Sequence, residues 1–131
     1  MSGILVTGAG GMLGRDVVRA AEDRGAEVHA LTRAELDITD AGAVAAAIAT
    51  LDPEVIVNCA AWTDVDGAES HEDEAFAINA TGPKVLAESG VRLVNVSTDY
   101  VFAGDKPAAY VEADPVDPQS AYGRTKLAGD Q

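Results

Sequence analysis

The sequence predicts an α/β fold built on a doubly wound parallel sheet, and two observations carry this prediction. First, short apolar segments alternate with segments of helical periodicity along the chain, which is typical of βαβ units and parallel strands. Second, an apolar run at residues 4–7 leads into a glycine-rich turn that is followed at once by a helical pattern. The 131 residues, 47% of them apolar, are enough for one domain with one core.

The glycine-rich turn carries Gly8, Gly11 and Gly14 between a strand over 4–7 and a helix over 12–24. In Rossmann-type sheets such glycines allow a tight turn, a close approach of backbone to phosphate, and close packing of helix on strand. The helix N-terminus then offers free N–H groups and a positive dipole end to an anion. The turn therefore predicts a site for the pyrophosphate of a dinucleotide.

The first helix and the next strand are predicted from the spacing of apolar residues and from the glycine that separates the two elements. One helix face is apolar, and Gly25 ends the helix. A strand over 27–31 comes directly after it. The residues expected on the buried face of the helix are Leu13, Val17, Val18 and Ala21.

The second helix is expected to begin at an Asp40 cap and to run to about residue 50. It is rich in alanine, with Val44 and Ile48 expected to face the core. Pro53 breaks the pattern after the helix, because proline cannot continue it.

The rest of the chain continues the alternation. An apolar strand over 54–58 suits a sheet covered on both faces. One long helix is expected from residue 71 to about residue 89, then a strand over 91–97, a Pro- and Asp-rich loop over 104–118, and a last helix from about residue 119. The expected core residues of the long helix are Phe76, Ile78, Val85 and Leu86.

The composition excludes several classes of function. A formal net charge of −13 argues against nucleic acid and anionic membranes as partners. No apolar run approaches the ~20 residues of a membrane span. Met1 and Ser2 lead straight into a strand, which leaves no room for a signal peptide. Cys59 is the single cysteine, which excludes an internal disulfide and fits a reducing cytoplasm.

The acidity has two interpretations. An ordinary acidic bacterial protein is favoured over a salt-adapted one.

No metal site is predicted. His29 and His71 lack ligand-spaced companions, and the carboxylates of Asp64, Asp66 and Glu69 lack the further ligands of a calcium loop.

Tyr122 and Lys126 share one face of the last helix, because they are four residues apart. A phenol is a weak acid, and a neighbouring ammonium ion stabilises its phenolate form. The pair is therefore a candidate proton donor, although the same spacing also occurs in ordinary surface pairs. Ser97 and Thr98 follow the fourth strand, where ligands of parallel sheets bind. Their alternative role is to satisfy loop backbone.

These segments together resemble the extended short-chain dehydrogenase/reductase superfamily and, within it, the dTDP-4-dehydrorhamnose reductases. The resemblance covers the whole chain. Its superfamily-wide motifs are the glycines and Tyr-Gly-Arg-Thr-Lys at 122–126, and its selective motifs are Ser-Thr-Asp-Tyr-Val-Phe at 97–102 and Thr-Asp-Val-Asp-Gly-Ala-Glu at 63–69. Leu-Asp-Ile-Thr-Asp at 36–40 matches the adenine-pocket segment of these reductases.

The resemblance implies an oxidoreductase that reduces the C4 keto group of a dTDP-sugar. It implies that Tyr122 donates the proton, Lys126 holds the nicotinamide ribose and Thr98 hydrogen-bonds the reacting oxygen. The implied substrate contacts are Val65, Asp99 and Tyr100. The implied cofactor contacts are Gly8, Gly11, Met12, Leu13, Gly14, Asp37, Ile38, Cys59, Ala60, Ala61, Thr63, Tyr122 and Lys126. For Cys59 the expected role is to shape the groove, not to act as a nucleophile.

The second strand suggests which nicotinamide cofactor binds. An NAD site usually has an acidic residue at this strand end. Here the chain reads Leu31-Thr32-Arg33, and a hydroxyl together with a guanidinium suits a 2′-phosphate. NADPH is therefore predicted, with Arg33 as a contact and NADH as the alternative.

Residues 1–131 are expected to be an incomplete NAD(P)-binding Rossmann domain without its substrate-binding region. The last helix is still in full pattern at Gln131, and the fourth strand is expected to be an unprotected edge where a fifth strand should pair. The isolated chain is therefore expected to be inactive, with a homodimer left open for the full-length protein. Two alternatives remain: another extended nucleotide-sugar epimerase or dehydratase, and a non-catalytic regulatory subunit like that of methionine adenosyltransferase.

Overall fold

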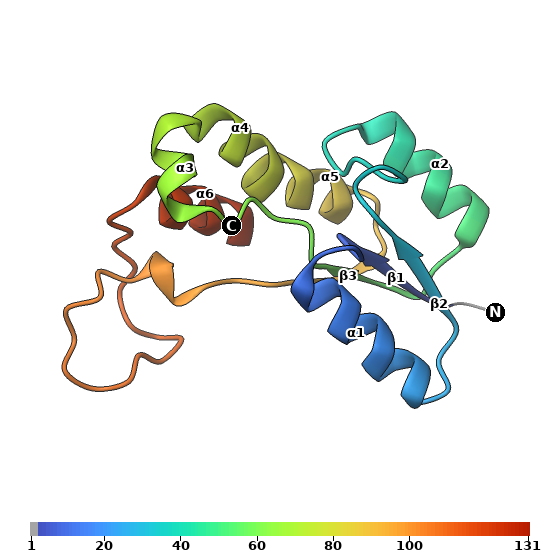
Figure 1. The fold of residues 1–131 in the computed structure, drawn as a ribbon, viewed down its shortest axis with the longest axis horizontal. Helices are drawn as coiled ribbons and strands as arrows, with labels where there is room; N and C mark the ends of the chain where they lie inside the picture. The colour runs from blue at the N-terminus through green and yellow to red at the C-terminus, as the bar shows by residue number, and fades with distance from the viewer. Residues whose placement is uncertain (1–2) are drawn as a thin grey trace.

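The computed structural model describes residues 3–131 and contains one parallel sheet in the order β2-β1-β3-β4 (Figure 1). The prediction that the chain has no signal peptide depends on Met1 and Ser2, and these two residues lie outside the described part of the chain. The sheet confirms the predicted α/β class and parallel pairing. Its strands are β1 (Ile4–Thr7), β2 (Val28–Leu31), β3 (Val55–Asn58) and β4 (Arg92–Asn95).

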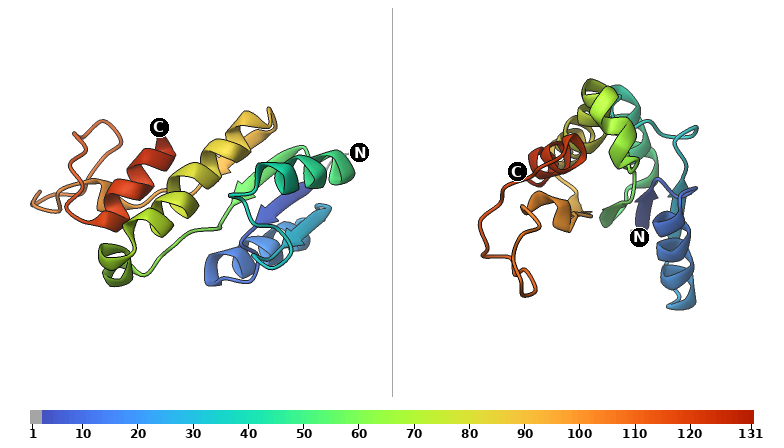
Figure 2. Two further views of the ribbon diagram at one scale, coloured as in Figure 1. Left: turned by 90° about the horizontal axis from the view of Figure 1, so that it is seen from above. Right: turned by 60° about the vertical axis from the view of Figure 1, so that its left-hand side comes forward.

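Helices cover both faces of the sheet. Helix α1 lies on one side, and α2 and α5 lie on the other (Figure 1). Helix α6 runs beside the α4–α5 segment, as the view from above shows (Figure 2). The helices are α1 (Met12–Asp23), α2 (Ala41–Leu51), α3 (Val65–Ser70), α4 (Glu72–Phe76), the π-helical η1 (Ala77–Thr81), α5 (Gly82–Glu88), the 3-10 turn η2 (Asp99–Val101) and α6 (Ala121–Asp130). Within residues 3–131 no helix is long and apolar enough to cross a bilayer.

The core lies between the sheet and the layer of α2 and α5. Leu5 and Ile56 from the strands meet Val44 from α2 and Leu86 from α5, and all four are buried. Burying one such side chain contributes about 2 kcal/mol. The buried positions of Val44 and Leu86 confirm the predicted faces of those helices.

The predictions that Phe76 and Leu13 lie in the core are wrong. Phe76 is 48% exposed, because α4 extends past the sheet and Phe76 faces a groove between α5, β4 and α6. Leu13 is 46% exposed, because it lies in the first turn of α1, beside the glycine turn instead of over the sheet.

The long helix expected over 71–89 is interrupted by a π-turn and preceded by an unpredicted helix, α3. Pro83 has no N–H to donate to the carbonyl of Asn79, so the α-helical ladder fails there. Gly82 N–H instead donates to the Ala77 carbonyl, five residues back. Asp64 caps helix α3, and its carboxylate accepts the Gly67 N–H at 3.0 Å. That cap is the local signal that periodicity alone did not show.

Candidate active site

A groove of about 370 Å³ opens along the carboxyl ends of β1, β2 and β3. It brings together eight of the predicted cofactor residues: Gly8, Gly11, Arg33, Asp37, Ile38, Cys59, Ala60 and Ala61. Five further lining residues were not predicted as cofactor contacts: Gly10, Thr32, Ala34, Leu36 and Ile78. Four of these five adjoin predicted positions, so the glycine turn and the β2 end were the available signals. Ile78 comes from the π-turn, and no local pattern places it there.

Close backbone packing explains two glycines of the turn. Gly8 has a φ of +63°, and a Cβ there would press against the backbone of Ala60. A Cβ on Gly14 would collide with the Gly8 carbonyl oxygen. At Gly11 a Cβ would meet nothing closer than 3.5 Å, so this glycine leaves open space in front of the backbone. The turn has the steric form that a pyrophosphate site requires.

The N-terminus of α1 is left without a side-chain cap in the described part of the chain. By contrast, Asp40, Asp64 and Ser120 each cap the helix that follows them. Met12, the first residue of α1, is 88% exposed. The first N–H groups of this 12-residue helix therefore remain free at the glycine turn. Together with the positive end of the helix dipole, they suit the binding of an anion.

The far wall of the groove is held by short polar contacts. The Asp37 carboxylate accepts the Thr39 hydroxyl at 2.7 Å and the Thr39 N–H at 2.9 Å, and these bonds lower the pKa of Asp37. Ile38 is buried beneath the wall. Cys59 is partly buried, and this burial raises the pKa of its thiol, which keeps it protonated and unreactive.

A buried row of polar side chains joins the carboxyl ends of three strands. The Thr7 hydroxyl donates to Asn58 Oδ1 at 2.6 Å, and Asn58 Nδ2 donates to Asn95 Oδ1 at 2.8 Å. Asn58 Oδ1 also accepts the Ala60 N–H at 3.2 Å. These bonds hold the carboxyl ends of β1, β3 and β4 together, and sequence patterning did not reveal them.

Tyr122 and Lys126 lie on α6, as predicted, but they point to different partners. The Tyr122 ring packs edge-on against Tyr100, with centroids 5.5 Å apart, and its hydroxyl has no hydrogen-bond partner among the described residues. Lys126 is 3% exposed and its Nζ donates to the Val96 carbonyl at 2.6 Å. Burial lowers the pKa of Lys126. Within residues 3–131 the two side chains share no hydrogen bond.

Helix α6 is set against its neighbours by close backbone contact. A Cβ on Gly123 would collide with the Tyr100 carbonyl, and one on Gly129 with the Asn79 carbonyl. The Ala121 N–H donates to Glu69 Oε1 at 2.9 Å. The helix thus brings Tyr122 beside the segment that follows β4, although the two are distant in sequence.

Thr98 caps the η2 turn by accepting the Tyr100 N–H at 3.2 Å. Its own O–H is still a donor, so the loop role and a contact with a substrate oxygen are compatible. Ser97 instead hydrogen-bonds the Asp130 carboxylate at the end of α6. Of the two hydroxyls after β4, Thr98 is therefore the better placed for chemistry.

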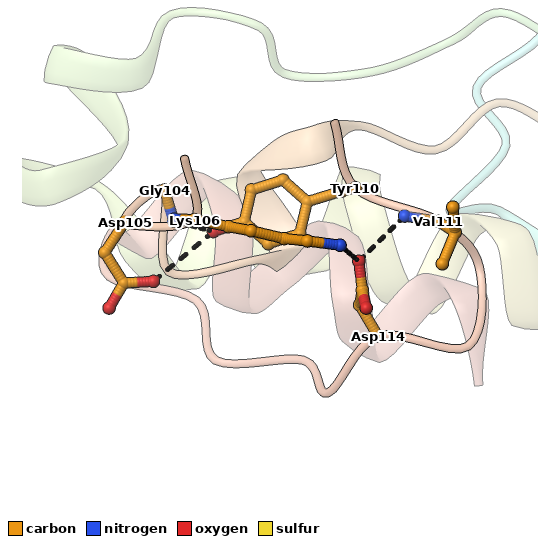
Figure 3. A network of polar contacts seen from close by, with 6 residues as sticks. All are labelled: Gly104, Asp105, Lys106, Tyr110, Val111 and Asp114. Carbon is orange, nitrogen blue, oxygen red and sulfur yellow. Dashed lines mark hydrogen bonds and ion pairs between the residues drawn. The ribbon is translucent and has the colours of Figure 1, made fainter. Parts of the chain in front are cut away.

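The loop over 104–118 is ordered by its own side chains (Figure 3). The Tyr110 hydroxyl accepts the N–H groups of Gly104 and Lys106 at 2.9 and 3.1 Å, and the ring stacks on Phe102 at 4.4 Å. Lys106 pairs with Asp114 at 2.6 Å, and this hydrogen bond lowers the pKa of Asp114.

A second cavity, of about 280 Å³, lies between this loop and the start of α6. Two of the predicted substrate residues, Asp99 and Tyr100, line it. Val65 starts helix α3 and does not line either cavity, and Thr63 is exposed outside the cofactor groove. The structure therefore separates the predicted residues into a groove along β1–β3 and a smaller cavity beside α6.

Asn79, in the π-turn η1, forms hydrogen bonds to two other segments near the candidate site. Its amide accepts the Trp62 N–H at 2.8 Å and donates to the Trp62 carbonyl and to Thr125 Oγ1, both at 3.1 Å. The side chain is 1% exposed. Asn79 thus bridges the segment after β3 and helix α6.

Replacing Asn79 by alanine is expected to lower the free energy of unfolding by about 3 kcal/mol, because both backbone groups of Trp62 lose their partner. Urea unfolding measures this loss. The control is Ser89→Ala, which removes a hydroxyl that donates to the Leu86 carbonyl and accepts the Val91 N–H at a helix end, and it is expected to cost about 1 kcal/mol. Equal losses in the two variants would contradict a special role for Asn79.

Comparison with known proteins matches this geometry. The profile described as "RmlD substrate binding domain" matches residues 1–131. A dTDP-4-dehydrorhamnose reductase of Streptomyces griseus is 50% identical over 131 residues, which cover 97% of this chain and 43% of the relative. A probable dTDP-4,6-dihydroxy-2-methyloxan-3-one 4-ketoreductase of Streptomyces antibioticus is also 50% identical, over 97% of this chain and 45% of its own length.

A solved structure gives the same result for the fold. The dTDP-4-dehydrorhamnose reductase of Bacillus anthracis in complex with NADP superposes with a TM-score of 0.93 at 36% identity, over 99% of this chain and 48% of that one. The chain thus spans less than half the length of the relatives it matches. With the profile covering every residue, this chain belongs to the RmlD substrate binding domain family.

Proposed function

We propose that the protein containing this chain reduces the C4 keto group of dTDP-4-dehydro-L-rhamnose to dTDP-L-rhamnose, with NADPH as the cofactor. The observation that carries the proposal is the glycine-lined groove along the carboxyl ends of β1, β2 and β3. Tyr122 on α6 supports it, because its hydroxyl has no hydrogen-bond partner in the described residues. In this proposal residues 1–131 form the dinucleotide-binding part. The relatives at 50% identity act on different dTDP-sugars by their names, so the 4-keto group is the shared feature.

The residues present fit a dinucleotide. The glycine turn and the uncapped N-terminus of α1 would hold the pyrophosphate, and the wall that contains Asp37 and Ile38 would hold the adenine. When bound, the cofactor supplies a hydride to C4 of the sugar. Arg33 beside the groove favours a 2′-phosphate, which supports NADPH over NADH.

The chain's own residues handle the proton. As C4 gains the hydride, its oxygen gains negative charge, and the Tyr122 O–H supplies the proton that makes the alcohol. The Thr98 hydroxyl can donate a hydrogen bond to the same oxygen. Lys126 is anchored by the Val96 carbonyl one helical turn from Tyr122, and its ammonium stabilises the phenolate that remains.

The test is an assay of the complete reading frame that encodes this sequence. With dTDP-4-dehydro-L-rhamnose we expect NADPH oxidation at an enzymatic rate, a dTDP-L-rhamnose product, and a higher kcat/KM with NADPH than with NADH. The control substrate is a dTDP-hexose without a keto group, which should leave NADPH unoxidised. NADPH oxidation absent from every dTDP-4-keto sugar would overturn the proposal.

A further inference from the structure

The turn after β2 brings an acidic side chain back onto the strand end. Glu35 Oε1 accepts both the N–H and the hydroxyl of Thr32, each at 3.0 Å. The turn itself is closed by the N–H groups of Glu35 and Leu36, which donate to the Thr32 carbonyl at 3.0 and 2.8 Å. The strand end that reads Leu31-Thr32-Arg33 in sequence therefore carries a carboxylate after all.

Thr32 lies where this carboxylate matters for a ligand. It lines the groove opposite the glycine turn, and its Cγ2 would be 3.4 Å from a Cβ built on Gly10. In Rossmann-type folds this strand end is where the ribose nearest the adenine is recognised. The N–H and the hydroxyl of Thr32 are donors of the kind that suit a phosphate, and Glu35 already occupies both.

Charges of both signs lie near Thr32. Arg33 is the one cation among the groove-lining residues of the described chain. The Asp37 carboxylate interacts electrostatically with the Arg33 guanidinium, and Glu35 is two residues after Arg33 in the sequence. Hydrogen bonds from Thr32 lower the pKa of Glu35, so this carboxylate is ionised at neutral pH. A dianionic phosphate here would meet one guanidinium and two carboxylates.

We propose that Glu35 is a specificity-determining residue that restrains the preference for NADPH, because its carboxylate holds the two Thr32 donors and repels a 2′-phosphate. NADPH then binds only when Glu35 turns out towards solvent and the phosphate takes its place between Thr32 and Arg33. NADH carries a neutral 2′-hydroxyl and leaves Glu35 where it is. The inference rests on the proposed function, since it requires a nicotinamide dinucleotide in the groove.

The experiment measures equilibrium binding of NADPH, NADH and 2′,5′-ADP to the complete protein and two variants. Glu35→Gln keeps an acceptor for Thr32 but removes the charge, and Glu35→Ala removes both. We expect Glu35→Gln to tighten NADPH and 2′,5′-ADP binding about threefold, and Glu35→Ala about tenfold, with NADH unchanged within about twofold. The tightening should shrink as salt rises, because the repulsion is screened.

Two controls separate the possible outcomes. Glu22→Gln removes one negative charge from an exposed site at the far end of α1 and should leave all three affinities unchanged. If the unmodified protein binds neither dinucleotide, the proposed function fails and this inference fails with it. If it binds them, but the Glu35 variants change NADPH and NADH equally, only the specificity role is overturned. A lowered melting temperature with weaker binding of both dinucleotides would assign Glu35 a purely structural role instead.

Discussion

Replacing Tyr122 by phenylalanine is expected to lower kcat about 1,000-fold in the complete protein, while KM for the dTDP-sugar changes little. General acid catalysis by one side chain contributes about 100- to 10,000-fold, and the substitution removes only the proton that the proposed mechanism transfers. The Tyr122 hydroxyl has no hydrogen-bond partner in the described residues, and its ring contact with Tyr100 is kept. Stability should therefore be unchanged, and steady-state kinetics beside a thermal melt measure both quantities.

Tyr100→Phe is the matched control for this prediction. Its ring lies 5.5 Å from that of Tyr122 and it lines the smaller cavity, so it shares the surroundings but not the proposed proton transfer. We expect less than a tenfold fall in kcat and a rise in KM. If both variants lose kcat to the same extent, Tyr122 is not the specific proton donor.

Gly14→Ala is expected to lower the free energy of unfolding by about 3 kcal/mol, despite the better helix propensity of alanine. The added Cβ would collide with the Gly8 carbonyl oxygen and would lie 2.8 Å from the Ala9 Cα. Both obstacles are backbone atoms, so no side chain can move away to relieve the clash. Either α1 must shift from β1 or the glycine turn must open. Urea unfolding and NADPH titration should show both stability and affinity reduced.

Gly11→Ala separates the two roles of the glycine turn. Gly11 has an extended backbone that any residue adopts, and its Cβ would be 3.5 Å from the nearest atom. Stability should stay within about 0.5 kcal/mol of the unmodified protein. Affinity for NADPH should fall at least tenfold, because the methyl group occupies the space proposed for the pyrophosphate. Undiminished NADPH binding by Gly11→Ala would move the pyrophosphate away from this turn.

Much of the fold could be predicted because its signals are local. The strand–glycine–helix unit at residues 4–23 depends on neighbours within a few positions, and so does the Asp40 cap of α2. Alternating apolar segments were enough for a parallel sheet. The break at residues 77–81 was not predicted from periodicity, because it arises from the backbone N–H that Pro83 lacks and not from the spacing of apolar side chains.

The candidate site divides in the same way. The positions of Gly8, Gly14 and Asp37 follow from a motif whose spacing is read directly along the chain. The Val96 partner of Lys126 and the Thr7 and Asn95 partners of Asn58 do not, since these hydrogen bonds join residues at least 30 positions apart. Glu35 shows a different limit, because its contact with Thr32 spans only three residues. Leu31-Thr32-Arg33, at and just after the end of β2, predicted an NADPH site without a carboxylate, and the turn that follows brings one there.

By itself the sequence determined the kind of fold, the glycine turn and the residue types available for proton transfer, because each depends on spacing along one segment. Only the tertiary structure decided which side chains meet: Asn79 with Trp62, Lys126 with Val96, and Tyr122 with Tyr100. The physical reason is that a buried polar group takes whichever partner the packed helices and strands place within about 3 Å, and that choice depends on the whole chain.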